Sequence, residues 1–478
     1  MRPRLFARAL VAISAIALAG CSGNMKVTTQ SGQVPVSMSM RDTPPTGVTI
    51  IAFEVHVTGA SLQPADSSKA AVPLVTHDTE IELRHLEVES ALLSTAGAAP
   101  GTYNSLNLTF ANPEMTIQNN SAAAITVGGK TCAVNTICEV DPPISPMSVQ
   151  VSSAPFPLTL AAGNALSLDV DFDVDSSVQN DLSVNPSVTV TPTITTANHE
   201  MEDIDELAGV VGTVSASSFT LTTFDNQMQT IQVNSNTQFE NFDKAACAAD
   251  NFSCVQSGQI VSVHLEVMDE DEGGDDESMG TTSTIGLVAK QVELEDHFQE
   301  ELEGEVVSIA GASGQFQLVV DGEDTPFQNI ALGNPVTVTV NAGATFDVDQ
   351  DGLSIPSGLS FQSISDVIVG QTVEVDPSGI AVGSSGISVT TDHVRLHHTH
   401  VTATITTVTG ANLTLTNLPS FFTAAGITQI QVQTSSQTEF DNVQDITGLS
   451  VNDTVSVGGL LFNSTPSPVL LAEKVRKR

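Results

Sequence analysis

The chain has 478 residues, with 15 Lys and Arg against 55 Asp and Glu, which gives a formal net charge of −40 and a pI near 4.1. This charge excludes a nucleic-acid partner, because binding a polyanion needs clustered cations that release counterions. The chain has no Trp and one Tyr, and only 15% of its residues are charged. Such a composition favours half-buried strands and tight turns over helices, and it indicates an architecture rather than a biochemical activity.

Residues 1–20 have the features of a bacterial export signal. A basic start precedes an apolar run at residues 9–19, which is too short to span a bilayer as a mature helix. The run ends in Leu18-Ala19-Gly20-Cys21, which resembles the bacterial lipobox. This resemblance implies that Cys21 is acylated and becomes the first mature residue, and that Ser22 favours the outer membrane. The alternative is ordinary secretory cleavage beside an incidental thiol.

No later stretch contains 18 or more apolar residues, so the acyl chains would be the membrane attachment. We therefore expect a protein that is lipid-anchored in the bacterial cell envelope and faces the periplasm or the cell exterior. Residues 21–33 are expected to form a tether between the lipid and the first domain.

Four further cysteines form two local pairs, Cys132 with Cys138 and Cys247 with Cys254. Exported proteins meet oxidising conditions, so each pair is predicted to close a disulfide loop that contributes roughly 2 kcal/mol. A zinc site is disfavoured, because zinc ligands prefer shorter spacings with His nearby.

Residues 34–198 are predicted to form an antiparallel β-sandwich, because apolar and polar residues alternate through one strand after another. The alternation is clearest at residues 166–175, where the acidic positions would follow one another about 6.8 Å apart along one strand face. That spacing favours a solvated face over an ion site. The acidic positions are Asp169, Asp171, Asp173 and Asp175.

Several segments of this region resemble domain of unknown function family 4382. The resemblance covers about a third of the chain and implies a position directly after a lipobox, but it brings no catalytic residues. It depends on Pro44-Pro45, Val55–Gly59, Leu83–Leu93, Pro100–Tyr103 and Leu168–Phe172.

An acidic linker is predicted at residues 199–206, and beyond it the chain repeats itself. Three units are predicted at residues 207–298, 299–400 and 401–478, and their first strands open 95 and 99 residues apart, at Leu207, Leu302 and Val401. Each unit has five predicted strands and a Thr-Phe-acid motif. The motifs are Thr237-Gln-Phe239-Glu240, Thr345-Phe346-Asp347 and Thr438-Glu-Phe440-Asp441.

Five short strands are too few for a broad sandwich, so closure into a small β-barrel is expected to remove the exposed edges. The pattern of residues 207–478 resembles domain of unknown function family 5666. That resemblance implies OB-like modules but no particular ligand, because function must be argued from a site. The predicted fold class is therefore all-β, with a sandwich followed by three five-stranded barrels.

The strongest candidate metal site is a tentative calcium loop with Asp347, Asp349 and Asp351 as ligands. Alternating carboxylates followed by Gly352 reproduce the first half of a calcium loop. The second half differs, since the twelfth position is Gly358 instead of a bidentate glutamate. A solvated turn is the alternative.

Other charged segments have plainer interpretations. His398 and His400 share a strand face and offer a weak transition-metal site, but a surface junction is favoured. The acidic residues 269–277 are expected to form a self-repelling loop. The basic end of the chain, residues 474–478, could contact anionic lipid, although a frayed tail or a neutraliser of the acidic field is favoured.

No catalytic motif is present: the sequence has no Gly-x-Ser-x-Gly elbow and no His-Glu-x-x-His pair. We therefore expect a non-enzymatic scaffold or interaction module that binds an envelope or extracellular protein or a glycan, with no cofactor. The first alternative is a calcium-dependent adhesion or ligand-binding lipoprotein. The second is a hydrolase, which would need a cleft containing His56 or His393.

Overall fold

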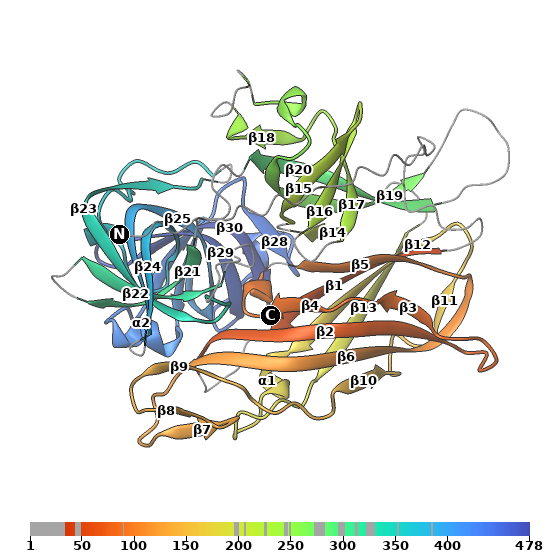
Figure 1. Cartoon of the computed structure of the whole chain (residues 1–478), viewed down its shortest axis with the longest axis horizontal. Coiled ribbons are helices and arrows are strands. Elements are labelled where there is room, and N and C mark those ends of the chain that lie inside the picture. The colour runs from red at the N-terminus through yellow and green to blue at the C-terminus, as the bar shows by residue number, and fades with distance from the viewer. Residues whose placement is uncertain are drawn as a thin grey trace, which may run out of the picture.

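The computed structural model describes residues 34–43, 49–88, 90–195, 200–204, 207–223, 227–242, 247, 250–271, 283–294, 302–310, 314–321, 330–350, 353–383 and 386–478. Nearly all regular structure in these ranges is β, which confirms the all-β prediction (Figure 1). None of the helices found there is long and apolar enough to cross a membrane. The predicted signal, Cys21 and the tether lie outside the described residues.

The N-terminal unit, residues 34–195, contains two large sheets (Figure 1). The first has the order β13 (Val188–Thr195), β12 (Ala165–Asp173), β1 (Val34–Thr43) and β5 (Ala91–Ala98). The second is built on two long strands that pair with each other, β2 (Ile50–Pro64) and β6 (Gly101–Gln118). Two short strands pair with β2, namely β3 (Val72–Val75) and β4 (Thr79–Glu82), and three pair with β6, namely β9 (Ile137–Val140), β10 (Ser148–Val151) and β11 (Leu158–Leu160). A hairpin of β7 (Ile125–Val127) and β8 (Lys130–Cys132) stands apart.

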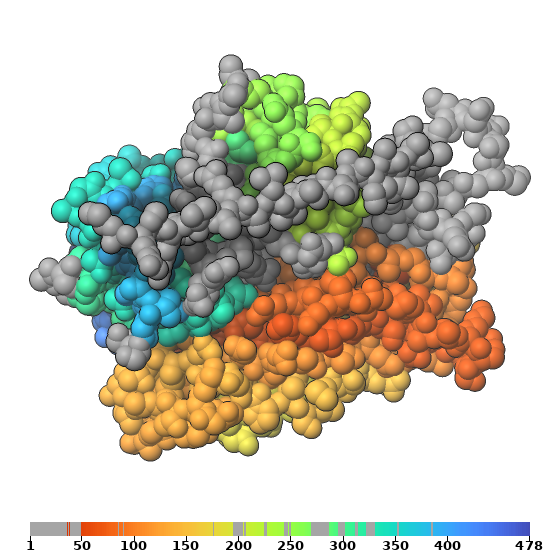
Figure 2. All heavy atoms as spheres, in the orientation of Figure 1, coloured from red at the N-terminus to blue at the C-terminus, as the bar shows by residue number. Residues whose placement is uncertain are grey.

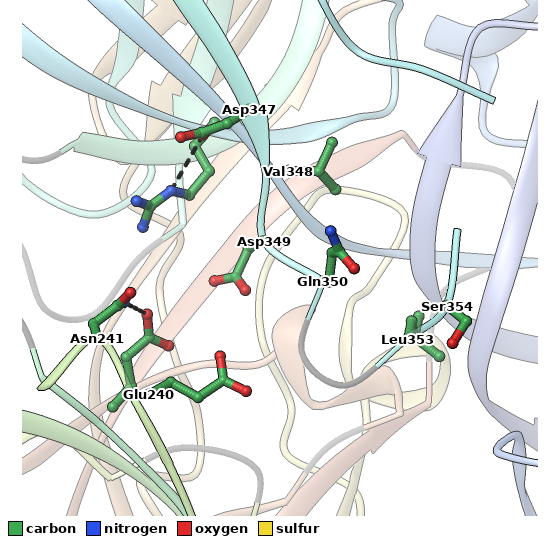
Figure 3. A pocket seen from close by; sticks show the side chains of 10 residues that line it. Glu240, Asn241, Asp347, Val348, Asp349, Gln350, Leu353 and Ser354 are labelled. Carbon is green, nitrogen blue, oxygen red and sulfur yellow. Dashed lines mark hydrogen bonds and ion pairs between the residues drawn. The ribbon is translucent and has the colours of Figure 1, made fainter. Parts of the chain in front are cut away.

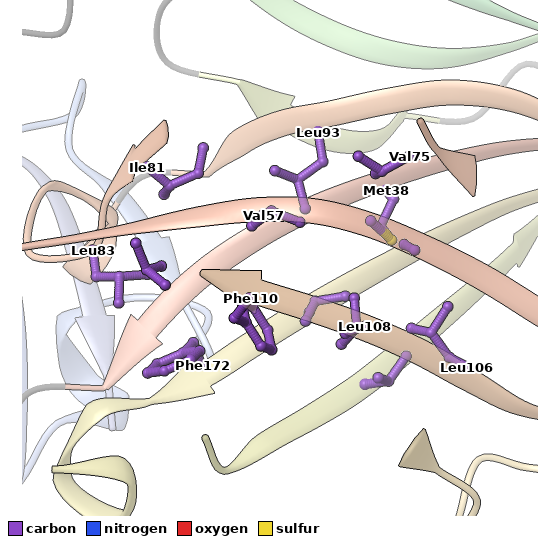
Figure 4. Close-up of a cluster of buried hydrophobic side chains, with 14 of the residues drawn as sticks. Met38, Val57, Val75, Ile81, Leu83, Leu93, Leu106, Leu108, Phe110 and Phe172 are labelled. Atoms are coloured by element: carbon purple, nitrogen blue, oxygen red, sulfur yellow. The ribbon is translucent and has the colours of Figure 1, made fainter. Parts of the chain in front are cut away.

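These two sheets enclose one hydrophobic core (Figure 4). The predicted alternation directs Phe172 inward, where its ring meets Phe110 edge-on at 5.4 Å and Phe53 at 6.0 Å between centroids. The pairing is not antiparallel throughout, because β1 runs parallel to β12 from Val36 beside Leu166 onward. That parallel pair departs from the antiparallel prediction.

The acidic face of β12 is shorter than predicted. The Asp173 carboxylate accepts the Ser176 N–H at 2.9 Å and thereby caps the short helix α1 (Val174–Ser177), so Asp175 lies in a helix and not on the strand. The outer side of this sheet also packs against β20 (Ser283–Leu294), a strand of the next unit. This face is therefore partly a contact surface.

The first of the three repeated units covers residues 207–294, and its paired strands form a closed ring. The order around the ring is β15 (Gly209–Val214), β16 (Ser218–Thr223), β17 (Met228–Gln232), β20 and β19 (Ile260–Asp271), which returns to β15. Residues 199–206, for which we predicted a linker, include β14 (Glu200–Ile204), which pairs with β19.

A five-stranded barrel forms the second unit, residues 302–397. Its order is β21 (Leu302–Ala310), β22 (Gln315–Val320), β23 (Pro335–Val348), β25 (Gly386–Thr409) and β24 (Thr372–Gly383), which returns to β21. The third unit, residues 398–478, closes in the same order through the far half of β25, then β26 (Asn412–Thr416), β27 (Ile430–Gln433), β30 (Val469–Lys477) and β29 (Thr454–Phe462). The predicted boundary at residues 400 and 401 therefore falls inside one continuous strand.

The units pack directly on the N-terminal unit (Figure 2). Ile51 and Ala52 of β2 lie in the same hydrophobic cluster as Val457 of β29 and Phe421 of the short helix α2 (Ser420–Ala424). Polar contacts add to this interface, since the Thr116 hydroxyl donates to the Gly333 carbonyl at 2.5 Å. The chain thus folds back on itself, and the third unit contacts the N-terminal unit.

Candidate functional site

The Thr-Phe-acid motif builds the same local structure in all three units. Each motif forms a short strand that runs parallel to the last strand of its unit. The phenylalanine lies opposite a valine in every case: Phe239 beside Val292, Phe346 beside Val394 and Phe440 beside Val475. The motif strands are β18 (Gln238–Glu240), the end of β23, and β28 (Glu439–Asp441).

The threonine explains why the motif has a fixed geometry. In the first and third units its hydroxyl donates to a carbonyl of the last strand, from Thr237 to Ala289 and from Thr438 to Ala472, both at 2.7 Å. The threonine and the phenylalanine together hold the motif strand in register. The acidic residue that follows is therefore carried on the outer face beside the last strand, because successive side chains of a strand alternate.

The partner of this acidic residue differs between the units. Asp441 is paired with Arg476 at 2.5 Å, and Asp347 with Arg395 at 3.3 Å. In the first unit the position of the arginine is occupied by Glu293, which lies directly beside Glu240. Two carboxylates thus stand where the other units have an ion pair.

These two glutamates open onto a cavity of about 440 Å³, here called the acidic pocket (Figure 3). Its wall comes from β18 and β20 of the first unit and from the end of β23 in the second. Burial raises the pKa of Glu293 to about 8, and Asp349 adds to this rise while His397 and Arg395 oppose it. The lining residues are Glu240, Asn241, Glu293, Asp347, Val348, Asp349, Gln350, Leu353, Ser354 and Arg395.

A row of cationic side chains continues from the acidic pocket along the outer face of β25. His393 lies between two carboxylates, with Nε2 3.0 Å from Asp347 Oδ2 and Nδ1 3.1 Å from Asp376 Oδ2. Hydrogen bonds to Asp347 and Asp376 raise the pKa of His393 to about 10. His397 follows, with Nε2 3.1 Å from Glu374 Oε2.

The three predicted calcium ligands have different surroundings. Asp347 already has both carboxylate oxygens engaged, one by His393 and the other by Arg395. Asp349 lines the acidic pocket, 3.9 Å from Nδ1 of His397. Asp351 lies outside the described residues. Calcium binding stays a prediction. The oxygen atoms near Asp349 in the acidic pocket come from Glu240 and Glu293, whereas the loop motif proposed Asp347 and Asp351 as the other ligands.

Other predicted residues lie away from this region. His398 Nδ1 is 2.8 Å from Glu473, and His56 Nδ1 is 2.8 Å from Asp78. Both cysteine pairs form disulfides, and the Cα atoms are 5.7 Å apart in Cys132–Cys138 and in Cys247–Cys254.

Sequence reasoning missed Glu293, Glu374 and Asp376. A signal for Glu293 was present, because aligning the last strands of the three units sets Val292-Glu293 against Val394-Arg395 and Val475-Arg476. Glu374 and Asp376 gave no such signal. Their proximity to His393 depends on the pairing of β24 with β25.

Comparison with known families finds two families in three segments of the chain. Residues 32–192 match Domain of unknown function (DUF4382), and residues 208–271 and 402–476 match Domain of unknown function (DUF5666). The matches confirm both family resemblances over these residues. No match was found among the curated proteins.

Proposed function

We propose that the chain is a non-enzymatic, lipid-anchored scaffold of the bacterial cell envelope, attached through Cys21, with the outer membrane as its favoured location. Its architecture would be a β-sandwich followed by three OB-like repeats. Support for the repeats comes from the common order of strand pairing and from the Thr-Phe-acid strand present in all three units. The acidic pocket would be its contact with an envelope or extracellular ligand.

The observation that carries this proposal is a clamp at the end of the chain. Arg478 Nη2 donates to the Glu87 carbonyl at 2.6 Å, and Arg476 Nη1 donates to the same carbonyl at 3.2 Å. Glu87 belongs to the 3-10 helix His85–Glu87 of the N-terminal unit, and its carboxylate accepts the Thr402 hydroxyl. The basic C-terminal residues are thus docked within the protein instead of fraying into solvent.

Such a clamp suits a scaffold. Charge-assisted hydrogen bonds are stronger than neutral ones, and these are largely shielded from water, since Arg476 is 5% exposed and Glu87 is fully buried. The third unit is held on the domain that follows the lipid anchor. The clamp would then keep the units that carry the acidic pocket in a compact arrangement with the N-terminal unit.

The lipid anchor is tested by substitution of Cys21. Full-length protein expressed in a bacterium should incorporate radiolabelled palmitate and fractionate with membranes, whereas Cys21→Ser should incorporate none and become soluble. Cys138→Ser leaves Cys21 intact and is the matched control. Equal labelling of the wild type and Cys21→Ser would contradict the proposed attachment.

Calcium-dependent ligand binding is the second candidate function, and one observation favours it. The carboxyl groups of Glu240, Glu293 and Asp349 face the same cavity, and hard cations such as Ca²⁺ prefer oxygen ligands. Calcium at 100 times its Kd should stabilise the protein by about 2.7 kcal/mol, seen as a rise in Tm.

Glu293→Gln combined with Asp349→Asn should abolish this rise in Tm. Asp392→Asn, which removes an exposed carboxylate outside the acidic pocket, should leave it unchanged. An equal rise in the double variant, or none in the wild type, would exclude calcium at the acidic pocket.

A further inference from the structure

We propose that Glu374, Asp376 and His393 form a binding site for a divalent transition-metal ion of the Zn²⁺ or Mn²⁺ class on the outer face of the second unit. None of these three ligands belongs to the predicted calcium loop, and the site does not depend on the proposed scaffold function. One ligand atom from each residue can be chosen so that all three lie within 4.8 Å of one another.

The spacing between two of these ligands matches the spacing of ligands around a single ion. Nδ1 of His393 is 3.1 Å from Oδ2 of Asp376. Zinc bonds of about 2.0–2.2 Å to imidazole and carboxylate place two ligand atoms roughly 3.3 Å apart around a tetrahedral ion. An imidazole nitrogen together with carboxylates favours Zn²⁺ or Mn²⁺ over Ca²⁺, which takes oxygen ligands.

Local backbone structure brings the three ligands together. Glu374 and Asp376 lie on β24, and His393 lies on the neighbouring strand β25. The register between these strands shifts between Val375 and Pro377, so Asp376 stands at an irregularity of the kind that redirects a side chain. The buried Thr391 hydroxyl holds the backbone at both ligands, since it donates to the Asp376 carbonyl at 2.8 Å and accepts the His393 N–H at 3.1 Å.

The residues around the site resemble the outer shell of a metal centre. A metal-bound histidine usually donates its other ring N–H to a carboxylate, which fixes the tautomer. Here Nε2 of His393 lies 3.0 Å from Asp347 Oδ2, and Arg395 holds the other oxygen of that carboxylate. Nδ1 of His393 points at Asp376, so a metal ion that replaced the Nδ1 proton would be held between these two side chains. Asp347 is thus a positioning residue and not a ligand.

An unsatisfied oxygen is an independent reason to expect a cation. Oδ1 of Asp376 is buried and has no hydrogen-bond partner among the described residues. Leaving a buried acceptor unpaired is unfavourable, and a metal bound through both oxygens of Asp376 would satisfy it.

Charge and access also suit a divalent ion. The group has a formal charge of −2 when His393 is neutral, because three carboxylates (Asp347, Glu374 and Asp376) outnumber one guanidinium (Arg395). One divalent ion balances this charge. The Asp376 side chain is 38% exposed and that of Glu374 is 9% exposed. Water can therefore reach the open side of the site and complete the coordination.

The test is metal binding by the full chain after removal of bound ions with a chelator. Calorimetric titration with Zn²⁺ or Mn²⁺ should give one equivalent of binding. His393→Ala and Asp376→Asn should each weaken it by about 100-fold or more, and Asp347→Asn by about 10- to 100-fold. His398→Ala is the control, because His398 is paired with Glu473 away from the ligands, and it should leave the affinity unchanged.

A spectrum of the unmodified chain covers the case in which a variant fails to fold. The Cu²⁺-loaded wild type should show ¹⁴N coupling from one imidazole in pulsed electron paramagnetic resonance. Absence of binding by the wild type would overturn the proposal. Full affinity in His393→Ala, or loss of affinity in His398→Ala, would overturn it as well.

Discussion

Replacing Gly370 with alanine should destabilise the protein by about 3 kcal/mol or more. Gly370 has φ +88°, and a Cβ atom there would lie 2.0 Å from Cζ of Phe422. Phe422 is fully buried and stacks on Phe421, so it has no room to move. The cost therefore combines a left-handed backbone, about 1 kcal/mol or more, with overpacking of about 1–3 kcal/mol. Urea unfolding of the variant and the wild type measures the difference.

Gly410→Ala is the matched control. Gly410 also has a positive φ of +61°, but a Cβ atom there meets nothing within 4 Å. Only the backbone cost should remain, about 1 kcal/mol. The difference between the two variants isolates the contact between the turn before β24 and helix α2. Equal losses would show that Phe422 does not pack on Gly370.

Substituting glutamine for Glu305 should stabilise the protein by roughly 3 kcal/mol at pH 8. Glu305 is 8% exposed and lies on β21, and its charged neighbours belong to the N-terminal unit. Burial raises its pKa to about 7; Arg84 opposes this rise, while Glu87 and Glu82 add to it. A neutral side chain of the same shape removes the cost of ionising this carboxyl inside the interface.

The sign of the pH dependence follows from the raised pKa. Between the unfolded value of 4.5 and the folded value of about 7, the folded state binds more protons than the unfolded state. Stability from this group is therefore fully present below pH 4.5 and is lost as the pH rises to about 7. Urea unfolding from pH 4.5 to 8 should show a smaller decline in Glu305→Gln than in the wild type.

Asp392→Asn provides the control for this pH series, because Asp392 is exposed. It removes the same formal charge and should leave the decline with pH unchanged. If Glu305→Gln declined as steeply as the wild type, the carboxyl at this interface would not be the source of the loss.

Local pattern was sufficient to predict the all-β class, the inward face of β12 and both disulfides. Alternation along a strand directly sets which side chains face the core, as it does for Phe172. The Thr-Phe-acid motif could also be predicted, because the threonine and the phenylalanine make their contacts within a single unit. Helix α1 was missed, since nothing in the alternating pattern distinguishes a capping Asp173 from a strand residue.

Features that depend on contacts between distant segments could not be predicted. Arg476 and Glu87 are 389 positions apart in sequence, and their hydrogen bond exists only because the third unit packs on the N-terminal unit. The acidic pocket likewise needs the first and second units side by side. The basic tail was therefore predicted to fray or to neutralise the acidic field, without its contact with the N-terminal unit, and Glu293 was not recognised as a pocket residue.

The C-terminal clamp, Arg476 and Arg478 on the Glu87 carbonyl, is expected to hold the third unit on the N-terminal unit. Spin labels at Ser67→Cys and Val451→Cys, both exposed positions, report the distance between these two units in a Cys21→Ser background. Pulsed dipolar spectroscopy should give one narrow distance distribution, and Arg476→Ala with Arg478→Ala should broaden it. A broad distribution in the chain with both arginines intact would show that the clamp does not hold the third unit on the N-terminal unit.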